Sequence, residues 1–373
     1  MDAAWERIAM KKEKVMVAMS GGVDSSVALL LLKDEYELTG VTLKLFDNGD
    51  IMLDRSKTCC SLSDVEDARS VARHYDVPYF VYNFGDKFKE QVVDRFNRAY
   101  MAGDTPNPCI DCNRFIKFDE LLKRAMLLEQ EYIATGHYAI REYDEASGRY
   151  LLKKAVDSTK DQTYVLYGLT QEQLKRTLFP LGKLTKVEAR KLAEQCELVN
   201  ADKPDSQDIC FVPDGDYASF IERYTGEHFE AGDFVDMTGK VVGRHKGIIH
   251  YTIGQRKGLG VALGKPAYVV AKNVAENTVT LGDESDLYQK TLIADDLNWI
   301  SIEQLTEPLR VKAKTRYKHA EQPAVISPLS DGRVFVEFDE PQRAITTGQA
   351  VVFYDGDLVV GGGRIAEAGA SKR

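Results

Sequence analysis

The feature that most constrains the fold is the junction between the apolar run Val15 to Met19 and the predicted helix Ser25 to Tyr36. The two are joined by Ser20-Gly21-Gly22-Val23-Asp24-Ser25. A strand that ends in a glycine loop and opens directly into a helix lets backbone N–H groups converge on an anion. The junction therefore predicts a phosphate-binding loop in an α/β domain.

Short apolar runs and longer amphipathic stretches alternate as far as about Val212, which is typical of a parallel sheet covered by helices. The expected strands are 15–19, 40–45, 78–83 and 132–135, and the expected helices are 25–36, 64–75, 115–129 and 185–196. After Pro213 the chain changes to short segments separated by glycines, as in small β modules. From about Leu292 its β-rich runs favour a small barrel.

These changes divide the 373 residues into three expected domains. Residues 1–213 form the α/β catalytic domain, 214–288 a small central β-rich adaptor, and 289–373 a C-terminal β-barrel.

Composition narrows the class of protein. The formal net charge of −9 excludes electrostatic wrapping of nucleic acid by the whole surface and restricts any RNA site to a local patch. The start of the chain lacks the long apolar core of a secretory signal, and no apolar run is long enough to span a membrane. We therefore expect a cytoplasmic protein.

The loop lacks the lysine of a Walker A motif, so hydrolysis of the γ-phosphate is not the expected chemistry. The hydroxyls of Ser20, Ser25 and Ser26 add donors for a pyrophosphate. A plain Gly-Gly turn before a capped helix is the structural alternative. The full string resembles the N-type ATP pyrophosphatase superfamily, whose members cleave ATP between the α- and β-phosphates.

Longer strings narrow the resemblance to the tRNA-specific 2-thiouridylase family. They are Thr105 to Asn113, Ile116 to Phe118, Ala134 to Tyr138, Lys160 to Gln162, Ser206 to Phe211 and Gly254 to Gly260. The resemblance runs from Lys14 to about Gly363. It implies ATP-dependent replacement of the 2-oxygen of a wobble uridine by sulfur, with Mg²⁺ as cofactor. The implied partners are tRNA and a persulfide-donating cysteine desulfurase or sulfur-relay protein, with no membrane.

The resemblance also assigns site residues. Cys112 is the implied nucleophile, and Cys210 the carrier of the persulfide. The implied ATP-binding residues are Ala18, Met19, Ser20, Gly21, Gly22, Val23, Asp24, Ser25, Leu43 and Gly136. From its place in the loop, Asp24 is also a candidate for a magnesium-associated acid. The implied tRNA contacts are Asn107, Pro108, Cys109, His137, Lys160, Asp161, Gln162, Arg316, Tyr317 and Gln349.

Two questions stay open at this stage. Many members have Asp where this chain has Cys109, so the general acid or base is unassigned. Cys59, Cys60, Cys109, Cys112 and Cys210 supply enough thiolates for zinc or an iron–sulfur cluster. The Cys-x-x-Cys spacing is equally typical of a redox pair, and no metal ligand is assigned.

Basic residues stand at every second position in one segment: Arg310, Lys312, Lys314, Arg316 and Lys318. A single β-strand would place all five side chains on one face. Such a face fits tRNA phosphates, and it equally fits a solvated strand beside a core. The alternative functions are an ATP-dependent ligase or amidating synthetase of the same superfamily, an iron–sulfur-dependent tRNA thiolase, and a noncatalytic RNA- or metal-binding module.

Overall fold

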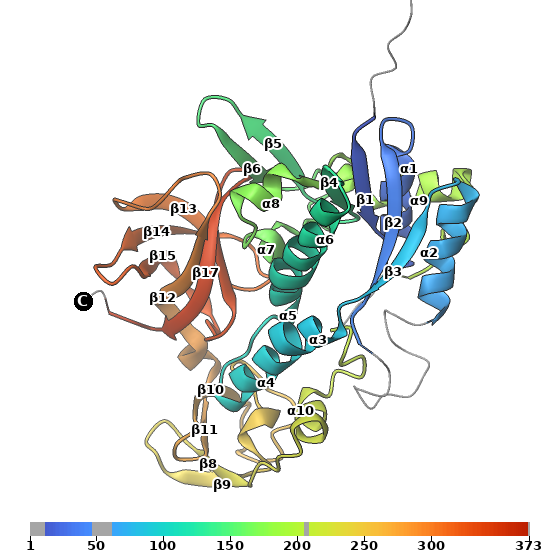
Figure 1. The fold of residues 1–373 in the computed structure, drawn as a ribbon. Helices are drawn as coiled ribbons and strands as arrows, with labels where there is room; N and C mark the ends of the chain where they lie inside the picture. The colour runs from blue at the N-terminus through green and yellow to red at the C-terminus, as the bar shows by residue number, and fades with distance from the viewer. Residues whose placement is uncertain (1–11, 47–61, 205–208, 372–373) are drawn as a thin grey trace, which may run out of the picture.

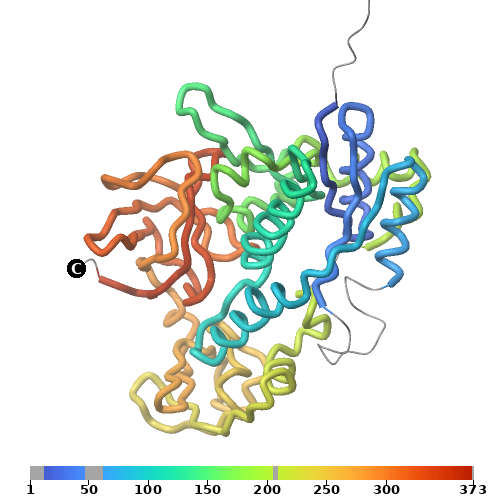
Figure 2. The backbone as a smooth tube through the Cα atoms, viewed as in Figure 1, coloured from blue at the N-terminus to red at the C-terminus, as the bar shows by residue number. Residues whose placement is uncertain are grey.

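The computed structural model describes residues 12–46, 62–204 and 209–371. Figure 1 shows three units: a parallel sheet with its helices on the right, a barrel on the left, and a smaller β unit at the bottom. Figure 2 shows that the chain passes through them in order, except for one hairpin of the first unit that reaches the barrel. No helix in these ranges combines the length and apolar character needed to cross a membrane.

The first unit is built on five parallel strands in the order β3-β2-β1-β4-β7. They are β1 (Lys14–Ala18), β2 (Glu37–Lys44), β3 (Tyr79–Asn83), β4 (Tyr132–Thr135) and β7 (Thr177–Leu178). Val15, Met16 and Val17 on the central strand are fully buried. Because β1 pairs with β2 on one side and β4 on the other, the loops after β1 and β4 meet where the strand order reverses. Such points are common ligand sites in α/β sheets.

Helices surround this sheet. Before β4 they are α1 (Val23–Leu32), α2 (Leu62–His74), α3 (Gly85–Phe88), η1 (Lys89–Val93), α4 (Asp94–Met101), α5 (Pro108–Asp111), η2 (Cys112–Glu120) and α6 (Leu121–Leu127). After β4 come α7 (Thr163–Leu166), α8 (Gln171–Lys175), η3 (Pro180–Lys183) and α9 (Lys186–Gln195). The apolar helix α1 is almost entirely buried. A capping box between Thr185 and Glu188 fixes the start of α9, which packs against α1.

The central unit contains α10 (Tyr217–Thr225), β8 (Gly232–Val235), β9 (Val241–His245), η4 (Ile248–His250), β10 (Tyr268–Asn273), β11 (Thr278–Gly282) and η5 (Glu284–Leu287). Its four strands follow the order β10-β11-β8-β9. Phe96 of α4, Phe211 and Phe220 of α10 pack with ring centroids 5.3 to 6.4 Å apart, so one aromatic core joins this unit to the first.

Six antiparallel strands form the barrel: β12 (Tyr288–Trp299), β13 (Leu309–Lys314), β14 (Gln322–Pro328), β15 (Val334–Arg343), β16 (Ala350–Asp355) and β17 (Leu358–Ala368). The pairing of β12 with β17 closes it. A hairpin of the first unit, β5 (Ile140–Asp144) and β6 (Arg149–Lys153), extends the β17 edge through the pair Leu358 and Lys153. The first unit and the barrel therefore share one continuous sheet.

The expected α/β class, parallel sheet and C-terminal barrel are confirmed. The expected strands and helices lie within a few residues of the observed ones. The hairpin β5–β6, whose strands pair with each other over five residues, was not predicted, and its pairing with β17 joins segments about 200 residues apart. The expected domain limits at 213/214 and 288/289 stay predictions.

Candidate active site

The glycine loop after β1 has a backbone that only glycine fits at Gly21. Its φ is +76°, and a Cβ atom there would lie 2.3 Å from the carbonyl oxygen of Asp64 at the start of α2. Gly22, with a Cβ position no closer than 3.5 Å to another atom, is less restricted. The loop is therefore pressed against α2 at one residue.

The carbonyl of Gly21 is held by two side chains from a distant segment. It accepts from Asn200 Nδ2 at 3.0 Å and from Lys203 Nζ at 3.2 Å. Asn200 is buried, and Lys203 also pairs with Asp64 and Asp67 at 2.5 and 2.7 Å. Because C=O and the following N–H point in opposite directions across a trans peptide, this anchor turns the Gly22 N–H away from the packed side of the loop.

The next carbonyl is fixed in the same way. The oxygen of Gly22 accepts from the hydroxyls of Ser25 and Ser26, at 2.9 and 3.3 Å, and this turns the Val23 N–H outward. Ser25 Oγ also accepts from the Ser20 N–H at 3.2 Å. In this structure the hydroxyls of Ser25 and Ser26, expected as phosphate donors, donate to the loop itself. The backbone N–H groups at the start of α1 face outward, and such groups can bind an anion.

The carboxylate of Asp24 forms an ion pair with the buried ammonium group of Lys186. Both of its carboxylate oxygens accept from Lys186 Nζ at 2.7 Å, and Oδ1 also accepts from the hydroxyl of Tyr138 at 2.8 Å. A carboxylate already paired in this way does not fit the expected role of magnesium ligand. The ion pair instead joins the first turn of α1 to the start of α9.

The loop after β4 lies directly beside the glycine loop. A Cβ atom on Gly136 would come within 2.8 Å of the Asp24 carbonyl carbon and the Ser25 nitrogen, so glycine is needed there. Leu43, near the end of β2, is half-buried on the other side of β1. Ala18 ends β1, Met19 is buried, and Ser20 is exposed. The sequence-predicted nucleotide residues thus gather at the carboxyl end of three neighbouring strands.

Cys112 is buried at the first residue of the π-helix η2. Burial raises the pKa of its thiol to about 11, while the charge of Lys117 acts in the opposite direction. Because a π-helix bonds residues five apart, Lys117 lies one turn from Cys112. Lys117 also helps burial to lower the pKa of His137 well below its ordinary value. One ammonium group therefore acts on both side chains.

Cys210 is positioned by its neighbour in the chain. Phe211 is fully buried against Phe88 and Phe96, at centroid distances of 5.7 and 5.3 Å. Cys210 itself is half-buried and packs against the same apolar core that contains Cys112. This core extends through all three units, with Cys112 inside it and Cys210 packed against it.

The segment before Cys112 is held by other units. The backbone of Thr105 donates to Thr347 at 3.0 Å, and its carbonyl accepts from Gln349 Nε2 at 2.6 Å. Asn107 caps α5 by accepting from the N–H of Cys109, which is exposed. Gln349, an expected tRNA contact, therefore holds the loop that leads to Cys109 and Cys112.

The remaining predicted tRNA residues fall into two groups. In the first group the side chains are bonded inside the protein. His137 is buried beside Phe118 and forms a hydrogen bond of 2.8 Å with the hydroxyl of Thr135. The side-chain oxygen of Gln162 accepts from the Tyr138 N–H. Asp161 is partly buried and bonded to Thr163 at 2.6 Å. Lys160 is half-buried, Pro108 is buried, and Tyr317 is exposed. The exposed members of the set are Cys109 and Tyr317.

The five-residue basic face is corrected by the structure. Arg310 and Lys312 point outward from β13, opposite the buried Val311, but β13 ends at Lys314. Beyond it the guanidinium of Arg316 donates to the carbonyls of Ile253 and Ala344 at 3.2 and 3.1 Å. Arg316 therefore ties the barrel to the central unit, which sequence alternation alone had no means to predict.

A metal cluster finds no support in the described ranges. No group of three or more His, Cys, Asp or Glu residues within them has an arrangement that would hold a metal ion. Cys59 and Cys60, which completed the thiolate set considered from sequence, lie outside the described residues.

The glycine loop, the switch point between β1 and β4 and the appended barrel define a nucleotide-binding protein of the HUP class. Residues 13–214 match the family described as tRNA methyl transferase HUP domain. Residues 218–283 match the tRNA methyl transferase PRC-barrel domain, and 289–365 the aminomethyltransferase beta-barrel domain.

Curated relatives identify the particular family. The chain is 56% identical to tRNA-specific 2-thiouridylase MnmA of Acetivibrio thermocellus, over 95% of this chain and 100% of that protein. It is 58% identical to MnmA 2 of Caldanaerobacter subterraneus (95% and 98%) and 53% identical to MnmA of Clostridioides difficile (95% and 99%). The chain belongs to the tRNA-specific 2-thiouridylase family, which is a family of enzymes.

Proposed function

We propose that this protein replaces the 2-oxygen of the wobble uridine of tRNA with sulfur in an ATP-dependent reaction. In the proposed sequence ATP first adenylates the oxygen, and a persulfide on Cys210 then supplies the sulfur. The observation that carries the proposal is the combination, in one unit, of an anion-binding glycine loop with two cysteines on a single apolar core. The high identity to proteins named 2-thiouridylases supports the choice of substrate.

ATP fits the loop because the packed carbonyls of Gly21 and Gly22 leave the N–H groups of Gly22 and Val23 turned outward. These N–H groups and the positive end of α1 would bind the phosphates. Gly136 lets the β4 loop approach without a side chain in the way. When bound, ATP would supply the adenylyl group that turns the uridine oxygen into a good leaving group.

In the sulfur step, the terminal sulfur of the Cys210 persulfide attacks C2 of the adenylated uridine, and AMP leaves with the oxygen. The Cys112 thiolate then attacks Sγ of Cys210 and breaks the S–S bond, which leaves the second sulfur on the base as a thiocarbonyl. Cys112 and Cys210 end as a disulfide, so a thiol reductant must restore them before the next turnover.

Lys117 has the proposed role of stabilising the Cys112 thiolate. Burial favours the neutral thiol, and the ammonium one helical turn away offsets part of that preference. Cys109 and Asp111 oppose this effect of Lys117, because negative charge on either side chain raises the pKa of Cys112 further. Lys117 was part of a motif string in the sequence, but only the π-helical winding explains its relation to Cys112.

The remaining components follow from the chemistry. No step is assigned to an Mg²⁺ held by Asp24, because Lys186 occupies that carboxylate. We propose that Mg²⁺ enters bound to the ATP phosphates. The persulfide would come from a cysteine desulfurase or a sulfur-relay protein. A cytoplasmic location suits thiols that must stay reduced.

The test combines the protein with ATP, Mg²⁺, a persulfide donor and unmodified tRNA. We expect AMP, pyrophosphate and a uridine whose mass rises by the difference between sulfur and oxygen. A nucleoside of unchanged mass, with AMP still formed, would contradict sulfur transfer and favour a ligase of the same superfamily. A mass increase that required added iron would favour an iron–sulfur thiolase instead.

A further inference from the structure

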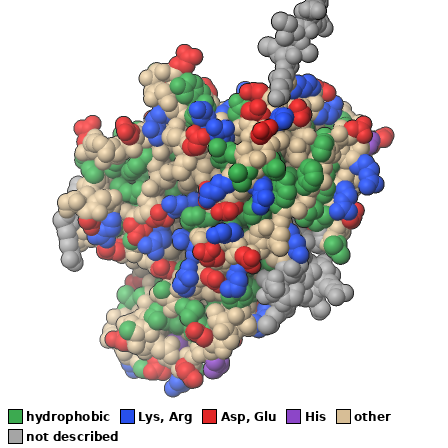
Figure 3. Space-filling view, viewed as in Figure 1, with side chains coloured by type: hydrophobic (Ala, Val, Ile, Leu, Met, Phe, Trp, Pro, Cys, Tyr) green, Lys and Arg blue, Asp and Glu red, His purple; other side chains and the backbone are tan. Residues whose placement is uncertain are grey.

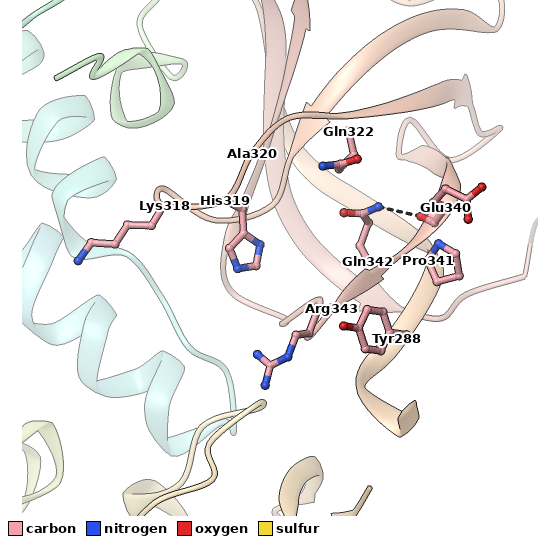
Figure 4. A pocket seen from close by; sticks show the side chains of 9 residues that line it. All are labelled: Tyr288, Lys318, His319, Ala320, Gln322, Glu340, Pro341, Gln342 and Arg343. Carbon is pink, nitrogen blue, oxygen red and sulfur yellow. Dashed lines mark hydrogen bonds between the residues drawn. The ribbon is translucent and has the colours of Figure 1, made fainter. Parts of the chain in front are cut away.

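A cavity of about 440 Å³ opens on the barrel where the segment after β13 faces the end of β15 (Figure 4). Tyr288, Lys318, His319, Gln322, Gln342 and Arg343 line it. Every one of these side chains carries an N–H or O–H group, and two carry a permanent positive charge. Lys318 belongs to the basic alternation noted in the sequence, and the reaction proposed above uses none of the lining residues.

The basic side chains come from the segment after β13 and from the end of β15. Figure 4 shows His319 above Arg343, Lys318 extending away from both toward the helices, and the carboxylate of Glu340 at the opposite side. Burial lowers the pKa of His319, and the charges of Arg316, Arg343 and Lys314 lower it further. Three basic side chains of a chain with a net charge of −9 therefore act on one imidazole. A local excess of positive charge of this kind attracts an anion.

Arg343 is held in place at the rim. Its guanidinium lies 5.6 Å from the ring centre of Tyr268, and its Nε lies 3.5 Å from a carboxylate oxygen of Glu284. Stacking on an aromatic ring fixes the plane of a guanidinium and reduces the freedom it loses when it binds a ligand. The two contacts come from the central unit, whereas every residue that lines the cavity belongs to the barrel.

The segment that lines the cavity follows directly on a residue predicted to contact tRNA. Tyr317 directly precedes Lys318, and its hydroxyl donates to the Asp161 carbonyl at 3.3 Å. Burial, the charge of Asp161 and then that of Cys109 raise the pKa of Tyr317, which places the exposed cysteine within electrostatic reach. Figure 3 shows lysine and arginine side chains across the middle of the face on which the barrel and the helical units meet.

We propose that this cavity binds a backbone phosphate of tRNA at a nucleotide other than the uridine that reacts. The proposal rests on the function proposed above, since it needs tRNA as the substrate. Lys, Arg, Gln and Tyr side chains are the usual partners of phosphate oxygens, and such contacts set the position of a nucleic acid. A docking site for a protein would instead present an apolar core.

The test measures binding of an unmodified tRNA transcript at several salt concentrations. We expect Lys318→Gln and Arg343→Gln each to weaken binding several-fold at low salt. The double variant should reduce the slope of log K against log salt by about one, the value for one lost phosphate contact. Arg333→Gln is the matched control, because it removes one charge from a half-buried arginine at the opposite end of β15 from Arg343.

Lys318→Arg keeps the charge and should retain the wild-type salt slope, which separates loss of charge from misfolding. Thermal unfolding and ATP binding of each variant check the fold independently. A double variant with wild-type affinity and salt slope would overturn the proposal, and so would normal tRNA binding with lost sulfur delivery from a protein donor. If these variants bind tRNA more weakly but the wild-type protein does not thiolate tRNA, the result would support the phosphate site and contradict only the proposed function.

Discussion

The glycine loop and the cysteine segment differ in what holds them. The glycine loop is fixed entirely within the first unit, by Asn200, Lys203 and its own serines. The segment from Asp104 to Cys112 is fixed by the barrel as well, through Thr347 and Gln349. A nucleotide site can therefore form in the first unit alone, whereas the proposed sulfur site depends on how the units sit together.

This difference makes a prediction about the two half-reactions. Changes in the glycine loop should weaken ATP binding whether or not tRNA is present. Changes in the cysteine segment or its supports should leave ATP binding intact and affect the steps that involve tRNA and sulfur.

The largest expected effect is that of Cys210→Ser. Without a thiol to carry the persulfide, thiolation should fall by at least about 1,000-fold, while ATP binding stays at the wild-type level. Nucleoside mass spectrometry measures the thiolation, and nucleotide titration measures the ATP binding. Cys196→Ser, at the end of α9, is the matched control and should keep its activity. Full activity of Cys210→Ser would remove this residue as the sulfur carrier.

Gly21→Ala should have the next largest effect. The new Cβ atom would lie 2.3 Å from a backbone oxygen, and alanine would have to adopt a φ of +76°. We therefore expect the free energy of unfolding to fall by about 2–4 kcal/mol and ATP binding to weaken about 100-fold. Gly22→Ala meets no such obstacle and should unfold within about 2 °C of the wild type. Equal melting temperatures for all three proteins would show that the loop is not pressed against α2.

The reactivity of Cys112 should depend steeply on pH. Because burial raises its pKa to about 11, only a small fraction is thiolate at pH 8, and alkylation should accelerate about tenfold per pH unit up to pH 10. Lys117→Met should slow alkylation at each pH, and Lys117→Arg should restore it. Peptide mass spectrometry after timed iodoacetamide treatment follows this cysteine alone. A rate that is constant above pH 8 would contradict the raised pKa.

Asn200→Ala tests whether the support behind the glycine loop matters for nucleotide binding. Loss of its bonds to Gly21 and Ser26 should lower stability by about 1–3 kcal/mol and raise the Kd for ATP about tenfold. Chemical denaturation and ATP titration give both values. Asn83→Ala, at an exposed position, is the control. Unchanged ATP affinity in a destabilised Asn200 variant would limit this residue to a role in stability.

The smallest expected effect belongs to Gln349→Ala. Removing the bond to the Thr105 carbonyl should raise the KM for tRNA about threefold and leave the Kd for ATP unchanged. Steady-state thiolation assays measure the first and titration the second, with the exposed Gln195→Ala as control. A change in ATP affinity of the same size would contradict the separation between the two halves.

Local patterns were enough to predict most of the first unit. The strand, glycine loop and helix from Lys14 to Leu32 depend on contacts between near neighbours, and they were predicted to within a few residues. The resemblance gave Gly136 as a nucleotide contact, and the parallel pairing of β1 with β4 explains why it lies beside the glycine loop.

What sequence did not predict comes from contacts between distant segments. The use of the serine hydroxyls, the pairing of Asp24 with Lys186 and the interdomain role of Arg316 each depend on a partner placed by the tertiary fold. Alternation through Lys318 suggested one strand, but nothing in the alternation marks Lys314 as its last residue. The side-chain partners of these residues therefore could not be predicted from the sequence.

The hairpin β5–β6 has a consequence for how the chain is made. It emerges from the ribosome about 200 residues before β17, the strand with which it pairs. The edge of β6 therefore stays unpaired until the last part of the barrel has been made. Exposed strand edges readily pair with other chains, and long-range pairing forms slowly. A chain released before the barrel is complete should therefore aggregate, and translation speed through the C-terminal third should influence the yield of active enzyme.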